Sequence, residues 1–183
     1  MKLSWSQKLF LRINKTLGKR PLLDKVMYFC GQWLIFILLA VTGIAVLYDI
    51  WFTGSWYIVY ICAIAFGITF TLSYVTALIF RHPRPIRELP HVKELIIPLE
   101  TWKSFPSDHT IASTLCVLII AAVSDETLFE SVATLLAAMA AVLIMYGRVY
   151  CGVHYPRDIL GGILFASIGA VLTVLICSRF FFG

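Results

Sequence analysis

Long uncharged segments, each close to the length that crosses a lipid bilayer, constrain this 183-residue chain more than any other feature. A transmembrane helix needs about 20 mainly apolar residues. Charged residues make up only 14% of the chain, whereas a typical soluble domain carries roughly a quarter. The sequence therefore predicts an all-α integral membrane protein with a single domain over residues 1–183 and a bundle of about five transmembrane helices. The five predicted spans are 27–48, 57–80, 107–123, 131–147 and 158–178.

Two segments outside the spans have patterns of their own. In residues 1–22, apolar positions recur every three or four residues among lysines and arginines, which predicts an amphipathic helix in the membrane interface that ends at Pro21. Residues 81–106 form a long polar loop that is rich in proline. Long loops in compact proteins usually carry function or are disordered, so we predict that this loop contributes to a functional site.

The net charge of +5 comes mostly from lysines and arginines that flank the apolar segments. We interpret this charge as favouring the anionic headgroups of the lipid bilayer or a phosphorylated substrate, and not a nucleic acid. The five cysteines lie in or beside apolar runs without a C-x-x-C pair. This pattern is typical of small buried hydrophobic residues.

The stretch Gly147–Asp158 places a cation, an imidazole and a carboxylate between two apolar runs, as Arg148, His154 and Asp158. Ionisable groups at a membrane boundary are functional-site candidates. An imidazole can attack an electrophile or transfer protons near neutral pH. Asp158 directly precedes an apolar run, where it can cap a helix and accept a hydrogen bond from an imidazole N–H. The pattern predicts that His154 is a catalytic residue oriented by Asp158.

Two further motifs supply groups that bind anions. RHPRP contains Arg84, and FPSDH contains Ser107, Asp108 and His109 immediately before the third apolar run. The free amides at the start of a helix bind anions. The planar guanidinium groups of Arg84 and Arg148 match the oxygens of a phosphate. Together, these residues predict a pocket for a phosphoryl group.

The three motifs resemble, in the same order, the signature motifs of the type 2 phosphatidic acid phosphatase superfamily. They are RP (Arg84-Pro85), PSDH (Pro106–His109) and R-x5-H-x3-D (Arg148, His154 and Asp158). These membrane lipid phosphatases share their site with vanadium haloperoxidases. The resemblance implies a helical phosphatidic acid phosphatase/haloperoxidase-like core. It also implies hydrolysis of a lipid-linked phosphate or diphosphate with no metal and no other cofactor.

The resemblance also implies a role for each motif residue. His154, oriented by Asp158, would attack phosphorus and form a phosphohistidine. His109 would protonate the leaving oxygen and then activate water. The oxygens of the phosphate would be held by Arg84, Ser107 and Arg148.

Two positions depart from the family pattern. The family usually has a lysine seven residues before the arginine of the first motif and a serine at the start of the third, but here these positions are Ala77 and Gly147. Lys103 and Arg87 are candidates to replace the missing lysine. Asp108, which stands where many members have glycine, resembles the undecaprenyl-diphosphate phosphatase branch, which tolerates loss of the lysine. We therefore expect Lys103 and Asp108 to belong to the phosphate-binding set and a polyprenyl diphosphate such as undecaprenyl diphosphate to be the substrate.

Three alternatives remain open. Phosphatidic acid, phosphatidylglycerophosphate or another lipid phosphate can be the substrate of the same chemistry. His109, His154 and Asp158 can instead form a metal site of two histidines and one carboxylate. The basic pocket can also belong to a lipid-phosphate binder or transporter without catalysis.

The charge distribution predicts which side of the cell membrane holds the site. With five crossings, the N-terminal segment, the loop 81–106 and the Gly147–Asp158 stretch share one face. Of the 15 lysines and arginines, 14 lie on that face and only Arg179 lies on the other. Because positively charged flanking segments stay in the cytoplasm, we expect a multi-pass protein with a cytoplasmic catalytic face. An extracytoplasmic face is the alternative.

Overall fold

The computed structural model describes residues 3–98, 102–124 and 128–181, and in this part of the chain the regular elements are all helices. The all-α class predicted from the sequence is therefore confirmed. The helices are α1 (Trp5–Asn14), α2 (Pro21–Gln32), α3 (Leu34–Thr53), α4 (Tyr57–Ile79), α5 (Pro85–Glu88), α6 (Asp108–Ala122), α7 (Leu128–Tyr150) and α8 (Pro156–Phe181).

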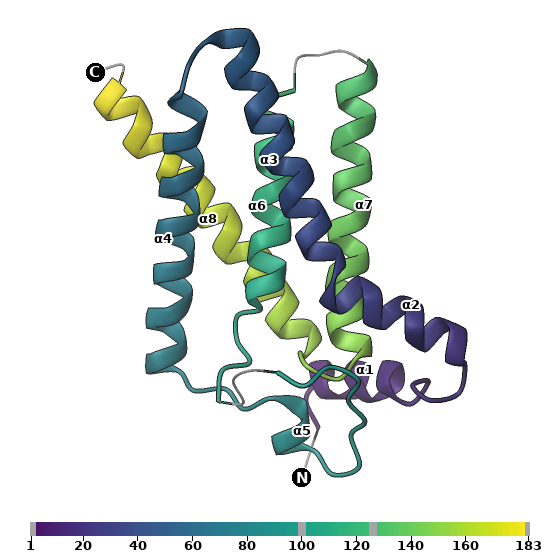
Figure 1. Ribbon diagram of the computed structural model, residues 1–183. Helices are drawn as coiled ribbons and strands as arrows, with labels where there is room; N and C mark the ends of the chain where they lie inside the picture. Colours follow the sequence, from purple (N-terminus) through teal and green to yellow (C-terminus); the bar gives the residue numbers. More distant parts are fainter. Residues whose placement is uncertain (1–2, 99–101, 125–127, 182–183) are drawn as a thin grey trace.

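Helices α3, α4, α6, α7 and α8 form a bundle in which successive helices run in alternating directions (Figure 1). α6 lies in the middle and packs against the other four. Its side chains Ile111, Leu115 and Cys116 are fully or almost fully buried. The motif at the start of α6 is therefore held in the interior of the bundle, and not on its lipid-facing surface.

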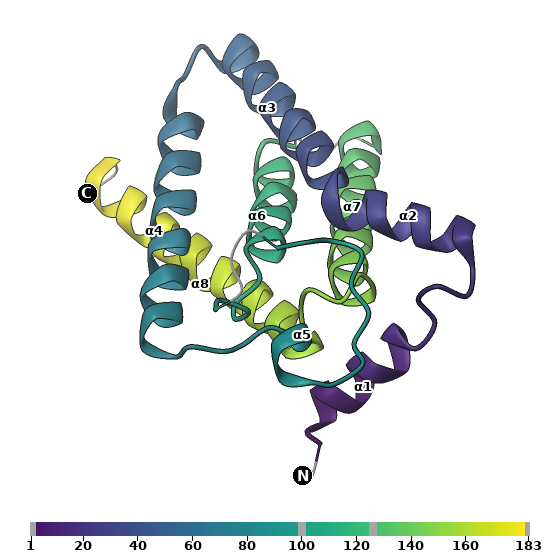
Figure 2. The same cartoon turned by 60° about the horizontal axis from the view of Figure 1, so that its bottom comes forward.

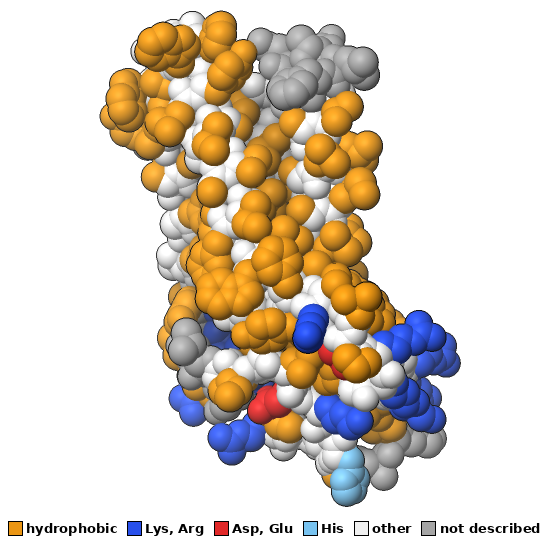
Figure 3. Space-filling model, turned by 45° about the vertical axis from the view of Figure 1, so that its right-hand side comes forward, with side chains coloured by type: hydrophobic (Ala, Val, Ile, Leu, Met, Phe, Trp, Pro, Cys, Tyr) orange, Lys and Arg blue, Asp and Glu red, His pale blue; other side chains and the backbone are white. Residues whose placement is uncertain are grey.

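Within the described residues, four helices are long and apolar enough to cross a membrane, over Leu34–Thr53, Tyr57–Ile79, Ser131–Tyr150 and Pro156–Arg179. The predicted third span corresponds to α6, which is apolar but has only 15 residues. Figure 3 shows apolar side chains over the length of the bundle and lysines and arginines gathered at one end. We call this end, which carries α1, α5 and the loops before α6 and after α7, the polar end.

The N-terminal helices differ from the sequence prediction. α1 ends at Asn14, and Pro21 begins α2 instead of ending the first helix. Proline suits the first turn of a helix because its missing N–H has no partner there in any case. The predicted span 27–48 is wrong as a single helix: α2 ends at Gln32, the chain bends at Trp33, and the apolar helix begins at Leu34.

A glycine pair explains why α2 separates from α3. α2 packs across the last turns of α7. A Cβ atom on Gly147 would lie 2.6 Å from the nitrogen of Gly31 and 3.0 Å from the carbonyl oxygen of Met27. A Cβ atom on Gly31 would lie 3.0 Å from the carbonyl carbon of Gly147. The two helices can approach this closely only because both positions lack a side chain, so Gly147 leaves no room for the serine of the family pattern.

The boundaries around the third motif also differ from the prediction. The predicted span ends at residue 147, but α7 continues to Tyr150, so Arg148 belongs to its last turn and not to a loop. The helix extends because Val149 and Tyr150 bury their side chains under α1 and α2. The turn that carries His154 is thereby shortened to a few residues before α8 begins at Pro156.

The described parts of the long loop, residues 81–98 and 102–106, contain the short helix α5. Figure 2 shows the chain between α4 and α6 spread across the polar end, with α5 beside α8. Asn14 of α1 holds this loop through both its amide nitrogen, which donates to Lys93 O at 2.7 Å, and its amide oxygen, which accepts from Lys93 N at 3.1 Å. The polar end is therefore a packed layer built from three distant parts of the sequence.

Candidate active site

A cavity of about 230 Å³ opens at the polar end, where the three motifs meet. It is lined by residues from four helices and from the loops before α5, after α5 and after α7: Gln32, Tyr74, Arg84, Ile96, Ile97, Pro98, Asp108, His109, Arg148 and His154. The lining combines two guanidinium groups, two imidazoles and an apolar wall from residues 96–98. An anionic headgroup attached to an apolar tail matches this combination.

His154 is held in one orientation by the loop before α6. Its Nδ1 lies 2.9 Å from the carbonyl oxygen of Ser104, which can only accept, so Nδ1 carries the proton. Burial, together with the nearby Arg148 and Arg84 and against the opposing effect of Asp158, lowers the pKa of His154 to about 4. At neutral pH the imidazole is therefore uncharged, and its unprotonated Nε2 faces the guanidinium group of Arg84.

Arg84 and Arg148 approach this imidazole from opposite parts of the chain. Arg84 Nη1 lies 3.3 Å from His154 Nε2 and donates to the carbonyl oxygen of Val153 at 3.0 Å. Arg148, which is 4% exposed, donates from Nη1 to the carbonyl oxygen of Gly31 at 3.0 Å. Its Nε is buried without a hydrogen-bond partner among the described residues. A backbone carbonyl therefore fixes each arginine, that of Val153 for Arg84 and that of Gly31 for Arg148, in the cavity that His154 also lines.

Asp158 makes its hydrogen bonds to Ser104 and to the backbone of Tyr155, and not to His154. Its Oδ2 accepts from Ser104 Oγ at 2.6 Å and from the backbone N–H of Tyr155 at 2.8 Å. The second bond caps the start of α8. The distance from Oδ2 to His154 Nδ1 is 3.7 Å, too long for a hydrogen bond. The expected direct bond between the two side chains is therefore replaced by a link through Ser104.

Lys103 and Asp108 form an ion pair at the edge of the cavity. Lys103 Nζ lies 2.6 Å from Asp108 Oδ1 and 4.1 Å from the ring centroid of Tyr74. Ser73 Oγ donates to the same carboxylate oxygen at 3.3 Å. Ser73 and Ala77 are both buried and one turn apart on α4, so Lys103 brings an ammonium group to the side of α4 on which the family usually has its lysine.

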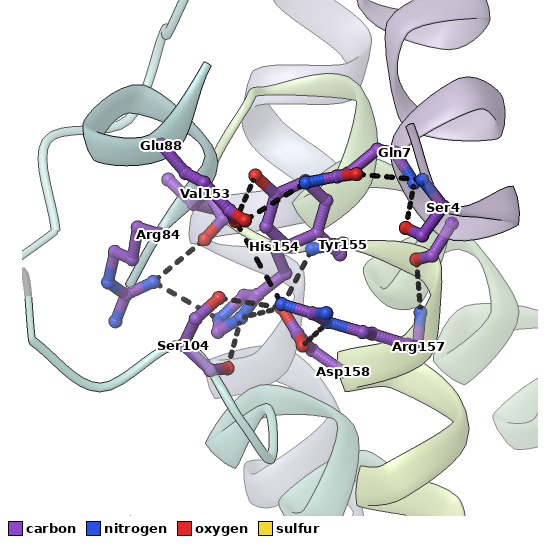
Figure 4. A network of polar contacts seen from close by, with 11 residues as sticks. Ser4, Gln7, Arg84, Glu88, Ser104, Val153, His154, Tyr155, Arg157 and Asp158 are labelled. Carbon is purple, nitrogen blue, oxygen red and sulfur yellow. Dashed lines mark hydrogen bonds and ion pairs between the residues drawn. The ribbon is translucent and has the colours of Figure 1, made fainter. Parts of the chain in front are cut away.

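A second network, drawn in Figure 4, connects the turn that carries His154, between α7 and α8, to the N-terminal helix α1. Glu88 of α5 accepts from Gln7 Nε2 at 2.9 Å and from the hydroxyl of Tyr155 at 2.8 Å. Ser6 Oγ accepts from the backbone N–H of Arg157 at 3.0 Å. The amphipathic helix α1 therefore supports the residues that directly follow His154, through Glu88 at Tyr155 and through Ser6 at Arg157.

The structure brings the predicted residues together at the polar end. Arg84, Asp108, His109, Arg148 and His154 line the cavity, whereas Lys103, Ser107 and Asp158 are not among its lining residues. Ser107 is fully buried, and its Oγ has no hydrogen-bond partner among the described residues.

Sequence reasoning missed Ser104 and Gln32. Ser104 directly precedes the FPSDH stretch, but no spacing rule connects it to His154. Gln32 lies near the start of the predicted span 27–48, where the one available signal is a polar side chain in an apolar run. In the described part of the chain, no three His, Cys, Asp or Glu side chains gather closely enough to hold a metal ion.

Comparison with known proteins identifies the arrangement. Residues 54–182, which contain the three motifs that meet at this cavity, match the PAP2 superfamily. The chain belongs to this family. It is therefore a multi-pass membrane phosphatase that hydrolyses lipid phosphates.

Relatives and solved structures support the same placement. YbjG of Escherichia coli (strain K12) is 30% identical over 169 residues, covering 92% of this chain and 80% of that protein. Undecaprenyl-diphosphatase BcrC of Bacillus subtilis (strain 168) is 28% identical over 174 residues, covering 87% of this chain and 78% of that protein. The crystal structure of Aquifex aeolicus LpxE has a TM-score of 0.70 and 25% identity, covering 95% of this chain and 97% of that one.

Proposed function

We propose that this PAP2 phosphatase hydrolyses a polyprenyl diphosphate such as undecaprenyl diphosphate through a phosphohistidine on His154. The observation that carries the proposal is the orientation of His154. Its Nδ1 proton is held by Ser104 O at 2.9 Å, which leaves Nε2 as the nucleophile in a cavity lined by Arg84 and Arg148. The activity in the name of BcrC of Bacillus subtilis and the PSDH motif favour the diphosphate substrate.

In the first step, His154 Nε2 attacks the terminal phosphorus. The bond from phosphorus to the bridging oxygen breaks. His109, which takes up a proton when the anionic headgroup enters beside it, donates that proton to the bridging oxygen. Arg84 moves from Nε2 to a phosphoryl oxygen, because the ligand's negative charge is a stronger acceptor than a neutral imidazole. Arg148, Ser107 and the first amides of α6 stabilise the charge that develops on the other oxygens.

In the second step, His109 accepts a proton from a water molecule that attacks the phosphohistidine. The phosphorus–nitrogen bond breaks, inorganic phosphate leaves, and His154 returns to its neutral form. Asp158 favours the transient positive charge on His154 from 3.7 Å and keeps Ser104 in place. No metal ion takes part in either step.

Lys103 and Asp108 fit a supporting role in binding the substrate phosphate. The 2.6 Å ion pair neutralises a carboxylate that would otherwise repel the anionic headgroup at the cavity edge. Of the two candidates for the missing lysine, Lys103 is placed beside the cavity, whereas Arg87 is exposed on α5. Replacing Lys103 by methionine is therefore expected to weaken substrate binding more than replacing Arg87 by methionine.

The proposal is tested by phosphate release from the detergent-purified full chain. The substrates are undecaprenyl diphosphate, a short isoprenyl diphosphate, phosphatidic acid and phosphatidylglycerophosphate, each with and without EDTA. We expect release from the diphosphates that resists EDTA and disappears in His154→Ala. The exposed His91→Ala is the matched control, because it removes an imidazole outside the cavity.

Each alternative predicts a different result. Inhibition by EDTA would favour a metal site of His109, His154 and Asp158. Equal binding of the lipid by wild type and His154→Ala, with no release from any substrate, would indicate a lipid-phosphate binder or transporter. Preference for phosphatidic acid or phosphatidylglycerophosphate would keep the mechanism and change the substrate.

We further propose that the polar end faces the cytoplasm, on the basis of its lysines and arginines (Figure 3). The test is labelling of His91→Cys, an exposed loop position, with a membrane-impermeant maleimide in intact cells. We expect labelling only after the membrane is opened. Labelling of intact cells above the level of the parent chain would place the loop outside the membrane and favour the extracytoplasmic alternative.

A further inference from the structure

We propose that Gln32, at the end of α2, is a phosphate-binding residue that donates its side-chain amide N–H to a phosphoryl oxygen. This inference rests on the proposed function, because it assigns another ligand to the same anionic headgroup. It concerns a part of the chain, residues before 54, that lies outside the PAP2 match.

The first argument is the position of Gln32. It lines the cavity together with Arg84, Arg148, His109 and His154. Its side chain is partly buried, and in the described part of the chain its amide has no hydrogen-bond partner. An amide in a cavity lined by two guanidinium groups and a neutral imidazole lies where an anion can bind, and its NH₂ group supplies two donors.

The second argument is that the backbone beside Gln32 is fixed. The preceding residue, Gly31, accepts a hydrogen bond from Arg148 Nη1 at 3.0 Å. Gly31 also packs against Gly147 so closely that neither position can hold a Cβ atom without contact at 3.0 Å or less. These contacts hold the end of α2 in register with the last turns of α7. A residue next to a fixed backbone loses little further freedom when it binds a ligand.

The third argument concerns the balance of donors around the phosphate. The close contact with Gly31 excludes a hydroxyl-bearing side chain at position 147, because a Cβ atom there would lie 2.6 Å from Gly31 N. The described residues of α2 and α7 that line the cavity are Gln32 and Arg148, so the donors from these two helices are an amide and a charged guanidinium group. Gln32 therefore supplies an uncharged donor from α2 on the side where α7 cannot carry one.

The experiment compares three variants in detergent: Gln32→Met, which keeps the length and removes the donors, Gln32→Glu, which adds a negative charge, and Lys25→Ala, an exposed α2 control. Phosphate release gives kcat and KM, and inorganic phosphate is used as an inhibitor and as a ligand in thermal unfolding. The loss of one hydrogen bond to a charged group commonly lowers the affinity tenfold or more.

We expect Gln32→Met to reduce kcat/KM and the affinity for inorganic phosphate by roughly tenfold, Gln32→Glu to reduce both further, and Lys25→Ala to reduce neither. The unfolding temperature without phosphate should be the same in Gln32→Met and wild type. A purely structural role would lower that temperature and leave phosphate affinity unchanged.

The outcomes separate this inference from the proposed function. A wild type that binds phosphate but releases none from any lipid would overturn the proposed function, and the phosphate-dependent rise in unfolding temperature would still test Gln32. Equal phosphate affinity in Gln32→Met and wild type would overturn the inference, as would a wild type that binds no phosphate.

Discussion

The middle and the C-terminal end of α7 obey different structural rules although they belong to one continuous helix. Near its middle, Leu136 and Val142 are 58% and 62% exposed on the apolar surface of the bundle, where any aliphatic side chain would serve. In its last turns, Gly147 admits no side chain and Arg148 is held by a backbone carbonyl of α2. The apolar surface needs only a class of residue, whereas the polar end needs particular atoms at particular places.

The same contrast separates the bundle from the polar end as a whole. One apolar cluster joins Ile35, Leu38, Cys116 and Ala141 from α3, α6 and α7 by nondirectional contacts. At the polar end, Ser104, His154 and Asp158 are connected by hydrogen bonds with defined donors and acceptors. Substitutions should therefore change stability in the first region and catalysis in the second, and five predictions test this division.

The largest effect is expected from Arg148→Lys. A lysine carries one ammonium group, which cannot donate to Gly31 O and bind a phosphoryl oxygen in the geometry of a guanidinium. We expect kcat to fall by about 100-fold or more, measured by phosphate release with the preferred lipid. Arg12→Lys, an exposed arginine on α1, is the control. If the two variants were equally active, Arg148 would not stabilise the transition state.

A smaller loss is expected from Asp158→Asn. The Nδ1 proton of His154 is held by the backbone of Ser104, which this substitution leaves in place. An asparagine can still accept one hydrogen bond but loses the negative charge that favours the imidazolium. We expect kcat to fall by roughly 10- to 100-fold, less than in His154→Ala. A loss as large as in His154→Ala would show that Asp158 orients the imidazole directly.

The pH dependence should reflect the buried histidine. Attack requires the neutral imidazole, and the pKa of His154 is lowered to about 4, so kcat/KM should persist well below the usual histidine pKa of about 6.5. Asp158 raises this pKa, so the acid limb should move lower still in Asp158→Asn. Profiles with a monophosphate and a diphosphate lipid separate the ionisation of the enzyme from that of the substrate. A limb near 6.5 with both lipids would contradict the prediction.

The same pKa has a consequence for stability. Because the pKa is lower in the folded than in the unfolded protein, the unfolded state takes up the proton first as the pH falls. The stabilisation from this group is fully present above about pH 6.5 and is lost between about 6.5 and 4. The unfolding temperature of wild type should fall over this range, and that of His154→Ala should fall less.

The smallest effect on activity is expected from a matched pair on α7. Ala141→Leu adds volume to a tightly packed cluster, at a cost of about 1–3 kcal/mol in the free energy of unfolding, whereas Val142→Leu extends a side chain that is 62% exposed. We expect a lower unfolding temperature only for Ala141→Leu and an unchanged kcat for both. A loss of kcat in Val142→Leu would show that the apolar surface takes part in catalysis.

Much of the candidate active site could be predicted because its ionisable side chains lie in short sequence motifs. Arg84, Asp108, His109, Arg148 and His154 were all predicted from three stretches, and all line one cavity. The role of Ser104 could not be predicted, since it depends on a carbonyl oxygen that meets an imidazole 50 residues further along the chain. A backbone acceptor has no sequence signature.

The prediction of helix boundaries was wrong where tertiary contacts override the local preference of the sequence. The apolar run from residue 27 predicted one span, but the contact of Gly31 with Gly147 turns α2 onto α7 and moves the start of the apolar helix to Leu34. Hydropathy cannot register this bend because both sides of it are apolar. The contact joins positions more than 100 residues apart, which no local window compares.

The sequence by itself determined the all-helical membrane class and the phosphoryl chemistry, because hydropathy and the character of Arg, His and Asp side chains are local properties. Only the tertiary structure decided which nitrogen of His154 is free, what holds Arg148, and that Gln32 reaches the cavity. Hydrogen bonds depend on positions within a few tenths of an ångström, and those positions are reached only when segments such as Gly31 and Arg148, 117 residues apart, pack together.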